Sequence, residues 1–237
     1  MLVVMEDGTL GALTVFRTEQ VTAWTRIDTT GTIHSVAVVG DDVYLLVQRP
    51  EGFSTRWNIE RLDDALHLDA GLYGESETPV SVWSGLDHLN GKTVAVVADG
   101  VLRPDATVSG GAVTLDPPAS KVEVGLPFTH VIEPLPPNPL NSGGGRGPAM
   151  RLVEVVFQLE DTAALRADVG AGLTDFPLRR LGDQALGDAA PARVSGIRRL
   201  RSLGWARDQT RPLWRIEQSA PLPFTLLSVT TELKVND

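Results

Sequence analysis

Short apolar stretches separated by turn residues fill the first sixty residues, and this pattern predicts a meander of short antiparallel strands. The breaks between them contain residues typical of turns, as at Asp7-Gly8, Thr30-Gly31, Gly40-Asp41-Asp42 and Glu51-Gly52. Strands spaced near ten residues apart are typical of a sandwich, a barrel or propeller blades. A single blade cannot bury both of its faces, so we expect another part to cover it. The predicted strands are Leu2–Met5, Leu10–Phe16, Val21–Arg26, Ile33–Val39, Val43–Gln48 and Trp57–Arg61.

Residues 63–80 are predicted to connect this meander to a second β module. Within this region, Leu62–Leu72 is expected as a short helix or an extended crossing, and Tyr73–Thr78 is polar. The β pattern resumes over 81–133, with hairpin turns at Asp99-Gly100 and Gly110-Gly111. The strands expected there are Val82–Trp83, Lys92–Ala98, Val101–Leu102, Thr107–Val108, Ala112–Leu115, Lys121–Val124 and His130–Glu133. The core of this module is predicted from Val94, Val96, Val108, Val113, Val122 and Val124.

The remaining sequence predicts a linker and a last β segment. Residues 134–149 are rich in Pro and Gly, which is typical of an interdomain linker or a loop tip. A strand follows over 150–160 with Val153, Val155 and Phe157 on one face, and a short helix is possible at Thr162–Asp168. The closing strands are expected at Leu200–Leu203, Leu213–Glu217 and Phe224–Leu233.

The pattern as a whole predicts a mainly β fold of antiparallel propeller-blade or sandwich-like modules with little helix. Its expected parts are a meander with its connector (1–80), a small module (81–133), the linker (134–149) and a segment that completes the platform (150–237). A hydrophobic content of 42% over 237 residues is enough to bury a real core.

Composition narrows the classes of partner. The chain has no cysteine, which excludes disulfides and thiolate metal sites. No stretch approaches the roughly 20 apolar residues of a membrane span, and the first residues lack the basic region of a secretory signal. The formal charge is −9 and uneven, since residues 1–133 carry 19 acidic and 8 basic side chains, and residues 134–237 carry 11 and 13. An acidic chain binds nucleic acid poorly but suits a surface that DNA passes without sticking.

Motifs that carry chemistry are not found, so we expect no catalytic residue, no cofactor, no metal and no enzyme activity. The four histidines lack zinc-site spacing, and the adjacent carboxylates lie at turns or element ends, where Asp caps and is solvated. No G-x-S-x-G elbow, phosphate-binding loop or calcium loop occurs. Asp87 and His88, the pair most like a catalytic dyad, are interpreted as turn and packing residues.

Arginine clusters between residues 178 and 211, where eight arginines stand against three acids. Such a cluster can contact phosphates or pair with the acidic half of a neighbouring copy, and the second fits better because the complementary charge lies on the same chain. Tryptophan and arginine are favoured anchors of interfaces, although core packing is the alternative for each tryptophan. The candidate subunit-interface residues are Arg198, Arg199, Arg201, Trp205 and Trp214.

Several blocks of the chain resemble the C-terminal part of the tail nozzle proteins of short-tailed bacteriophages, also called tail tubular protein B. The most specific are WSGLDHL at Trp83–Leu89 and the closing segment IEQSAPLPFTLLSV at Ile216–Val229. The similarity extends over nearly the whole chain. The other blocks are Leu10–Trp24, Ile33–Arg49 with the WNIERL run Trp57–Leu62, Val97–Arg103, Val108–Leu115 and the VGLPF run Val124–Phe128.

The resemblance implies a structural virion protein without a catalytic site. Nozzle proteins form a six-membered ring below the portal and adaptor, line the exit channel for genomic DNA and help to retain it until ejection. The implied partners are copies of the chain, the portal-adaptor and other tail proteins, and DNA that passes without specific binding. The implied location is the virion tail, after assembly in the host cytoplasm.

A receptor-binding or tail-tip role is the alternative. In this hypothesis the chain is a baseplate or glycan-binding module of a phage or phage-like particle, and an exposed tryptophan at Trp57, Trp83 or Trp205 stacks on a sugar.

Overall fold

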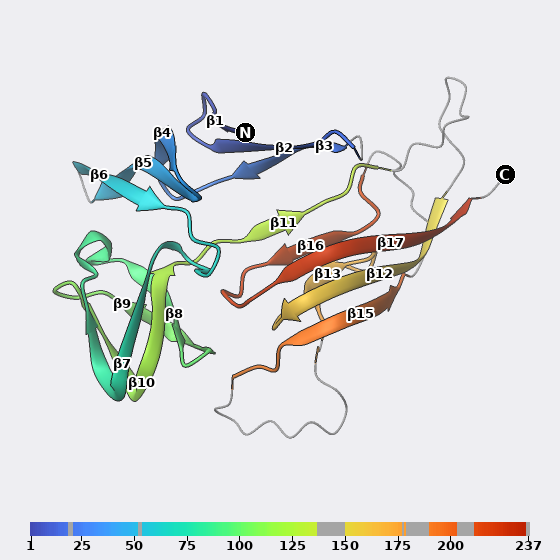
Figure 1. Cartoon of the computed structure of the whole chain (residues 1–237). Helices are drawn as coiled ribbons and strands as arrows, with labels where there is room; N and C mark the ends of the chain where they lie inside the picture. Colours follow the sequence, from blue (N-terminus) through green and yellow to red (C-terminus); the bar gives the residue numbers. More distant parts are fainter. Residues whose placement is uncertain are drawn as a thin grey trace. The chain divides into compact units, whose positions relative to one another are not determined.

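The computed structural model describes residues 1–18, 21–51, 54–136, 150–176, 178, 190–202 and 211–235. Strands dominate these residues, and the one helical element is a single 3-10 turn, η1 (Asp87–Leu89). The strands form small, open, three- or four-stranded antiparallel sheets (Figure 1). The prediction of a mainly β fold with little helix is confirmed.

The chain divides into two compact units. The N-terminal unit comprises residues 1–73 together with 123–126, and the C-terminal unit comprises residues 74–122 and 127–237. The division therefore falls inside two long strands, β7 (Asp69–Ser84) and β10 (Ala112–Leu126).

The N-terminal unit is built from two three-stranded sheets, in the orders β1-β2-β3 and β4-β5-β6. Leu10, Ile33, Leu45 and Val47 form its buried core, with apolar residues of β1 and β3 packed around them. The six strands predicted from the alternation are all present. Their bounds are β1 (Leu2–Val4), β2 (Leu10–Phe16), β3 (Val21–Ile27), β4 (Thr32–Val39), β5 (Asp42–Glu51) and β6 (Ser54–Arg61).

The predicted connector is wrong in its second half. Turns occupy the residues after β6, but β7 already begins at Asp69 and runs through the polar stretch Tyr73–Thr78. Because β7 is the edge strand of its sheet, its side chains can be polar while its backbone is paired with β10. The alternative of a short helix over Leu62–Leu72 is wrong, and from Asp69 the chain is extended and paired as part of β7.

The second sheet has the order β7-β10-β8-β9, with β8 (Thr93–Ala98) and β9 (Val101–Thr107) joined by the predicted Asp99-Gly100 hairpin. Two predicted strands, Ala112–Leu115 and Lys121–Val124, are parts of the single strand β10. The core prediction is confirmed, since all six valines are 4% exposed or less. They are Val94, Val96, Val108, Val113, Val122 and Val124.

Two glycines of this region stand where the backbone is approached closely. A Cβ at Gly125 would lie 2.8 Å from the Cα of Gly71 and 2.9 Å from the carbonyl oxygen of Asp69. A Cβ at Gly111, where φ is +72°, would collide with the carboxylate of Asp87. The absence of a side chain thus lets β10 and η1 pack against their neighbours.

The rest of the C-terminal unit is a sandwich of two sheets, in the orders β15-β12-β17 and β11-β16-β13-β14 (Figure 1). Phe157, Leu159 and Ile216 are among the fully buried residues between them. The strands are β11 (His130–Ile132), β12 (Met150–Thr162), β13 (Arg166–Asp168), β14 (Thr174–Asp175), β15 (Val194–Arg201), β16 (Arg215–Gln218) and β17 (Thr225–Val235).

A register shift in β12 changes the predicted inward face of that strand. The pairing with β17 shifts between Leu152 and Glu154, so Leu152 is buried where alternation predicts Val153. Val155 and Phe157 are fully buried, as predicted.

The expected helix at Thr162–Asp168 is wrong. β12 continues to Thr162, and β13 follows from Arg166. The buried Thr162 hydroxyl donates to the carbonyl of Thr225 and accepts a hydrogen bond from its amide, so a contact distant in sequence overrides the local preference. Of the predicted linker 134–149, residues 137–149 lie outside the described residues.

Candidate functional site

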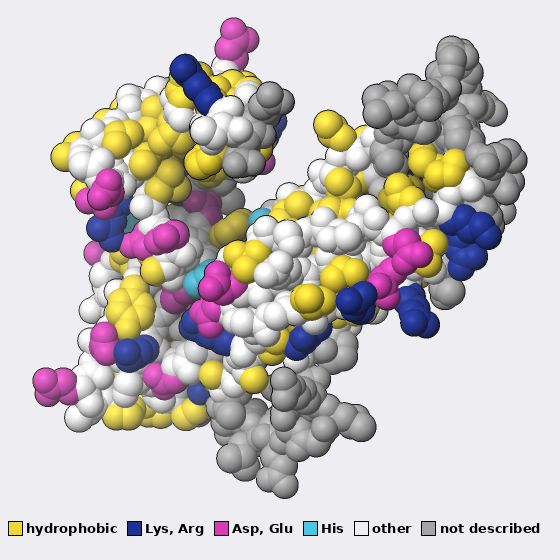
Figure 2. Space-filling model, turned by 45° about the vertical axis from the view of Figure 1, so that its right-hand side comes forward, with side chains coloured by type: hydrophobic (Ala, Val, Ile, Leu, Met, Phe, Trp, Pro, Cys, Tyr) yellow, Lys and Arg dark blue, Asp and Glu magenta, His cyan; other side chains and the backbone are white. Residues whose placement is uncertain are grey.

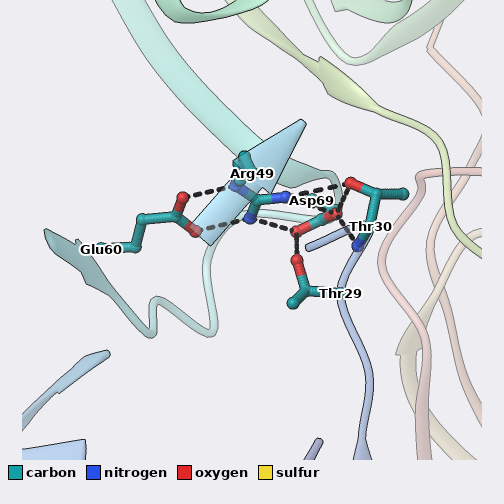
Figure 3. Close-up of polar contacts among 5 residues, drawn as sticks. All are labelled: Thr29, Thr30, Arg49, Glu60 and Asp69. Carbon is teal, nitrogen blue, oxygen red and sulfur yellow. Dashed lines mark hydrogen bonds and ion pairs between the residues drawn. The ribbon is translucent and has the colours of Figure 1, made fainter. Parts of the chain in front are cut away.

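The most strongly organised polar group of the N-terminal unit centres on Arg49, whose side chain is 5% exposed. Its guanidinium lies between two carboxylates, Glu60 on β6 and Asp69 at the start of β7 (Figure 3). Arg49 Nη2 donates to Glu60 Oε2 at 2.6 Å and to Asp69 Oδ1 at 2.8 Å. Both carboxylates are engaged in forked pairs, the geometry that arginine favours over lysine.

Two threonines of the loop between β3 and β4 complete this Arg49 cluster. Thr29 donates its hydroxyl to Asp69 at 2.7 Å, and Thr30 donates both its hydroxyl (2.6 Å) and its backbone amide (2.9 Å) to the same carboxylate. The Thr30 hydroxyl also accepts a hydrogen bond from Arg49 at 3.0 Å. The cluster therefore ties a loop, two strands of one sheet and the beginning of β7 together (Figure 3).

The electrostatics of the cluster favour its charged form. Burial alone would raise the pKa of Asp69, but the hydrogen bonds from Arg49 and Thr30 outweigh it and lower the pKa to about 2. Burial alone would lower the pKa of Arg49, and its hydrogen bonds to Glu60 and Asp69 instead raise that pKa above its usual value. With its charges paired and its lone pairs satisfied, the cluster is built to hold strands rather than to transfer protons.

The low pKa of Asp69 predicts a pH dependence of stability. A carboxyl with a folded-state pKa below its ordinary 3.8 stabilises the fold above pH 3.8, and this contribution is lost as the pH falls through about 2. The shift corresponds to about 2 kcal/mol. Urea unfolding between pH 5 and pH 2 should give a steeper loss of stability for the wild type than for Asp69→Asn. Parallel curves for the two proteins would contradict this assignment.

The predicted interface arginines do not share one face. On β15 the pairing places Arg198 opposite Phe157 on the inner side of the sheet, where its guanidinium donates to the carbonyl of Leu178. Arg199 and Arg201 point outward, and their side chains are 63% and 88% exposed. Side chains on a strand alternate between its two faces, so a strand that includes residues 198–201 places Arg198 on the opposite face from Arg199 and Arg201. The strand predicted from the sequence begins only at Leu200 and therefore does not make this distinction.

The two predicted interface tryptophans have different outcomes. Trp214 is 7% exposed and packs edge-on against Phe157, with ring centroids 5.5 Å apart. This burial supports the alternative of core packing for Trp214. Trp205 lies outside the described residues.

An apolar cavity of about 360 Å³ lies in the C-terminal unit, lined mainly by small apolar side chains. Gln218 is its buried polar member, and the amide nitrogen of this side chain has no hydrogen-bond partner among the described residues. The lining has one carboxylate, Asp175, whose side chain is 90% exposed. This described lining lacks the facing pair of carboxylates on which glycoside hydrolysis depends.

The described residues contain no group of three or more His, Asp or Glu side chains arranged to hold a metal ion. Asp87 and His88 lie in η1, whose flanking Leu86 and last residue Leu89 are buried. In the part of the chain that is described, no helix is long and apolar enough to cross a membrane.

Exposed apolar sheet faces are the second prominent feature of the N-terminal unit, and they agree with the expectation that another part covers its strands. Fourteen of the twenty-two large hydrophobic residues that are exposed among the described residues belong to the N-terminal unit, which holds about a third of the chain. On the outer face of β4-β5-β6, Trp57 is 52% and Ile59 is 78% exposed. Broad hydrophobic areas appear on the surface in Figure 2. The stretch Leu10–Phe16 is apolar on both faces of its strand, and such stretches are typical of strands that are covered on both sides.

A scan against protein-family models finds no matching family, and a search of curated proteins finds no match.

Proposed function

We propose that this protein is a non-enzymatic structural subunit of a bacteriophage tail, a nozzle-like ring component that lines or extends the DNA-exit channel. The observation that carries the proposal is the apolar outer face on each of the two sheets of the N-terminal unit. Large exposed apolar patches on a protein surface mark sites of association with a partner. The chain is therefore a part of a larger assembly.

The resemblance to tail nozzle proteins suggests which assembly this is. The blocks that carry the resemblance have structural roles here: the WSGLDHL block ends with η1, and the VGLPF block contains Gly125, where a side chain would meet the backbone. The closing block contains the last three residues of β16 and the beginning of β17. A scaffold function accounts for these residues without any chemistry.

The charge of the N-terminal unit suits a channel for DNA. This unit carries twelve acidic and five basic side chains. Carboxylates on channel-facing loops would repel phosphates within about 8 Å, the Debye length at physiological salt. DNA would then pass without being bound.

The test is the composition of purified particles. Phage or phage-like particles from cells that carry this gene should contain the chain in a fixed small copy number by quantitative mass spectrometry. Cryo-electron microscopy should place it as a ring on the tail axis. Particles that eject DNA normally and lack the chain would overturn the proposal.

A glycan-binding module at a tail tip is the second candidate, and Trp57 favours it. Its exposed ring lies 4.7 Å from the ring of His34, which contacts Gln48 at 3.0 Å, so an aromatic surface stands beside hydrogen-bonding groups. A glycan array should then show binding that Trp57→Ala abolishes. An array without signal for the wild type would exclude this candidate.

A further inference from the structure

The outer face of the sheet β1-β2-β3 forms a continuous apolar surface, which we call the N face. Trp24 lies opposite Leu13 in the register, and its ring covers Gly11 together with the sulfur of Met5. Trp24 is 58% exposed. The opposite side of the sheet contributes Leu10 to the core. The N face consists of Met1, Val3, Met5, Leu13, Val15 and Trp24.

The edge of the N face is acidic. Arg26 follows Trp24 by two positions and pairs with Asp7 at 3.1 Å and Asp28 at 2.7 Å, so one guanidinium stands against two carboxylates. Glu6, which is exposed, adds a third carboxylate. An apolar centre with a tryptophan and a charged rim is the usual composition of a protein interface.

The outer face of the sheet β15-β12-β17, which we call the C face, is basic and partly apolar, so it complements the acidic edge and apolar centre of the N face. Arg199 and Arg201 project from it and share a single carboxylate, Glu154, at 2.9 and 3.9 Å. The pairing adds Arg151, Lys234 and Glu232 at the same end of the sheet, so four basic side chains stand against two acidic ones. Ile197, which is 54% exposed, and Val156 give this face an apolar part.

We propose that the N face of one copy of this chain docks on the C face of a second copy. The apolar part of the C face covers Trp24, and Arg199 and Arg201 meet the acidic edge formed by Asp7 and Asp28. The two faces are different surfaces, so the contact is head-to-tail. Repeated contacts of this kind form a closed ring when the rotation between neighbouring copies closes, and an open filament when it does not. The inference rests on the proposed function and names the surfaces through which its subunits would assemble.

Two variants and their mixture test this contact. Trp24→Glu places a charge in the apolar N face, and the double variant Arg199→Ser with Arg201→Ser removes two basic side chains from the C face. Each change disables one of the two docking surfaces. Each variant alone should be monomeric in analytical ultracentrifugation, with a dissociation constant raised about 30-fold or more, the effect of losing an interface hot spot. An equimolar mixture should form a dimer and nothing larger, because each variant keeps the face that the other lacks. Circular dichroism checks that both remain folded.

Matched controls and the remaining outcomes decide the assignment. Leu102→Glu, at an exposed apolar residue of β9, and Arg193→Ser, at an exposed ion pair, lie outside both faces and should assemble like the wild type. Assembly by either face variant alone, a mixture without dimers, or a wild type that stays monomeric at every concentration overturns the proposed contact. The proposed function fails separately, through absence of the chain from purified particles.

Discussion

Arg49→Met should lower the free energy of unfolding of the N-terminal unit by about 3 to 5 kcal/mol, the usual effect of removing one partner from a buried ion pair. The loss is large because Glu60 and Asp69 would remain with their negative charges and no guanidinium between them. Asp69 is also held by Thr29 and Thr30, so it cannot turn to solvent without breaking those hydrogen bonds. Urea unfolding at pH 7, followed by hydrogen exchange over residues 29–69, measures the effect.

Arg26→Met is the matched control for this prediction. Arg26 also lies between two carboxylates, but its side chain is 62% exposed and water replaces the lost contacts. The unfolding midpoint should therefore remain close to that of the wild type. Equal losses for the two variants would show that burial is not what makes the Arg49 cluster strong.

Phe157→Ala should destabilise the C-terminal unit by about 3 to 5 kcal/mol, the range for deleting a buried aromatic ring. Phe157 is fully buried on β12, and its ring meets that of Trp214 edge-on at an interplanar angle of 82°. Removal of the ring leaves a cavity in the middle of the sandwich and ends this aromatic contact. Chemical unfolding monitored by hydrogen exchange over β12 and β16 reports the loss.

Phe128→Ala provides the comparison, since that ring is 43% exposed. Its removal opens no enclosed cavity, so the C-terminal unit should keep nearly all of its stability. A Phe157→Ala protein as stable as Phe128→Ala would mean that the sandwich repacks around the missing ring.

Strands were predictable from the sequence wherever one face is apolar, and less so where the sheet edge is polar. Leu10–Phe16 has the predicted bounds because its apolar run and flanking turns agree. The Tyr73–Thr78 part of β7 has no such alternation, since pairing at an edge is decided by the backbone. The strand conformation at Thr162 could not be predicted from the local sequence either, because the hydrogen bonds of Thr162 reach a residue 63 positions away.

The Arg49 cluster and the outward faces of the sheets were harder to predict from the sequence than the strands. Arg49 and Asp69 are 20 residues apart, and only the fold brings them within hydrogen-bond distance. The separation of Arg198 from Arg199 follows from strand alternation once β15 is known to begin at Val194. The apolar character of the N face was visible in the sequence, but its exposure depends on which side of the sheet the core occupies.

The Arg49 cluster also has an evolutionary consequence. Loss of Arg49 leaves two carboxylates without a cation between them, and loss of Glu60 or Asp69 leaves the guanidinium without one of its two forked pairs, so a change at any of the three positions weakens the contacts of the other two. Single changes at these positions should therefore be rare among descendants of this sequence. Where the arginine has been replaced, we expect a neutral side chain at Asp69 in the same lineage. The three positions should be inherited as a block, and a variant library selected for folding should recover that covariation.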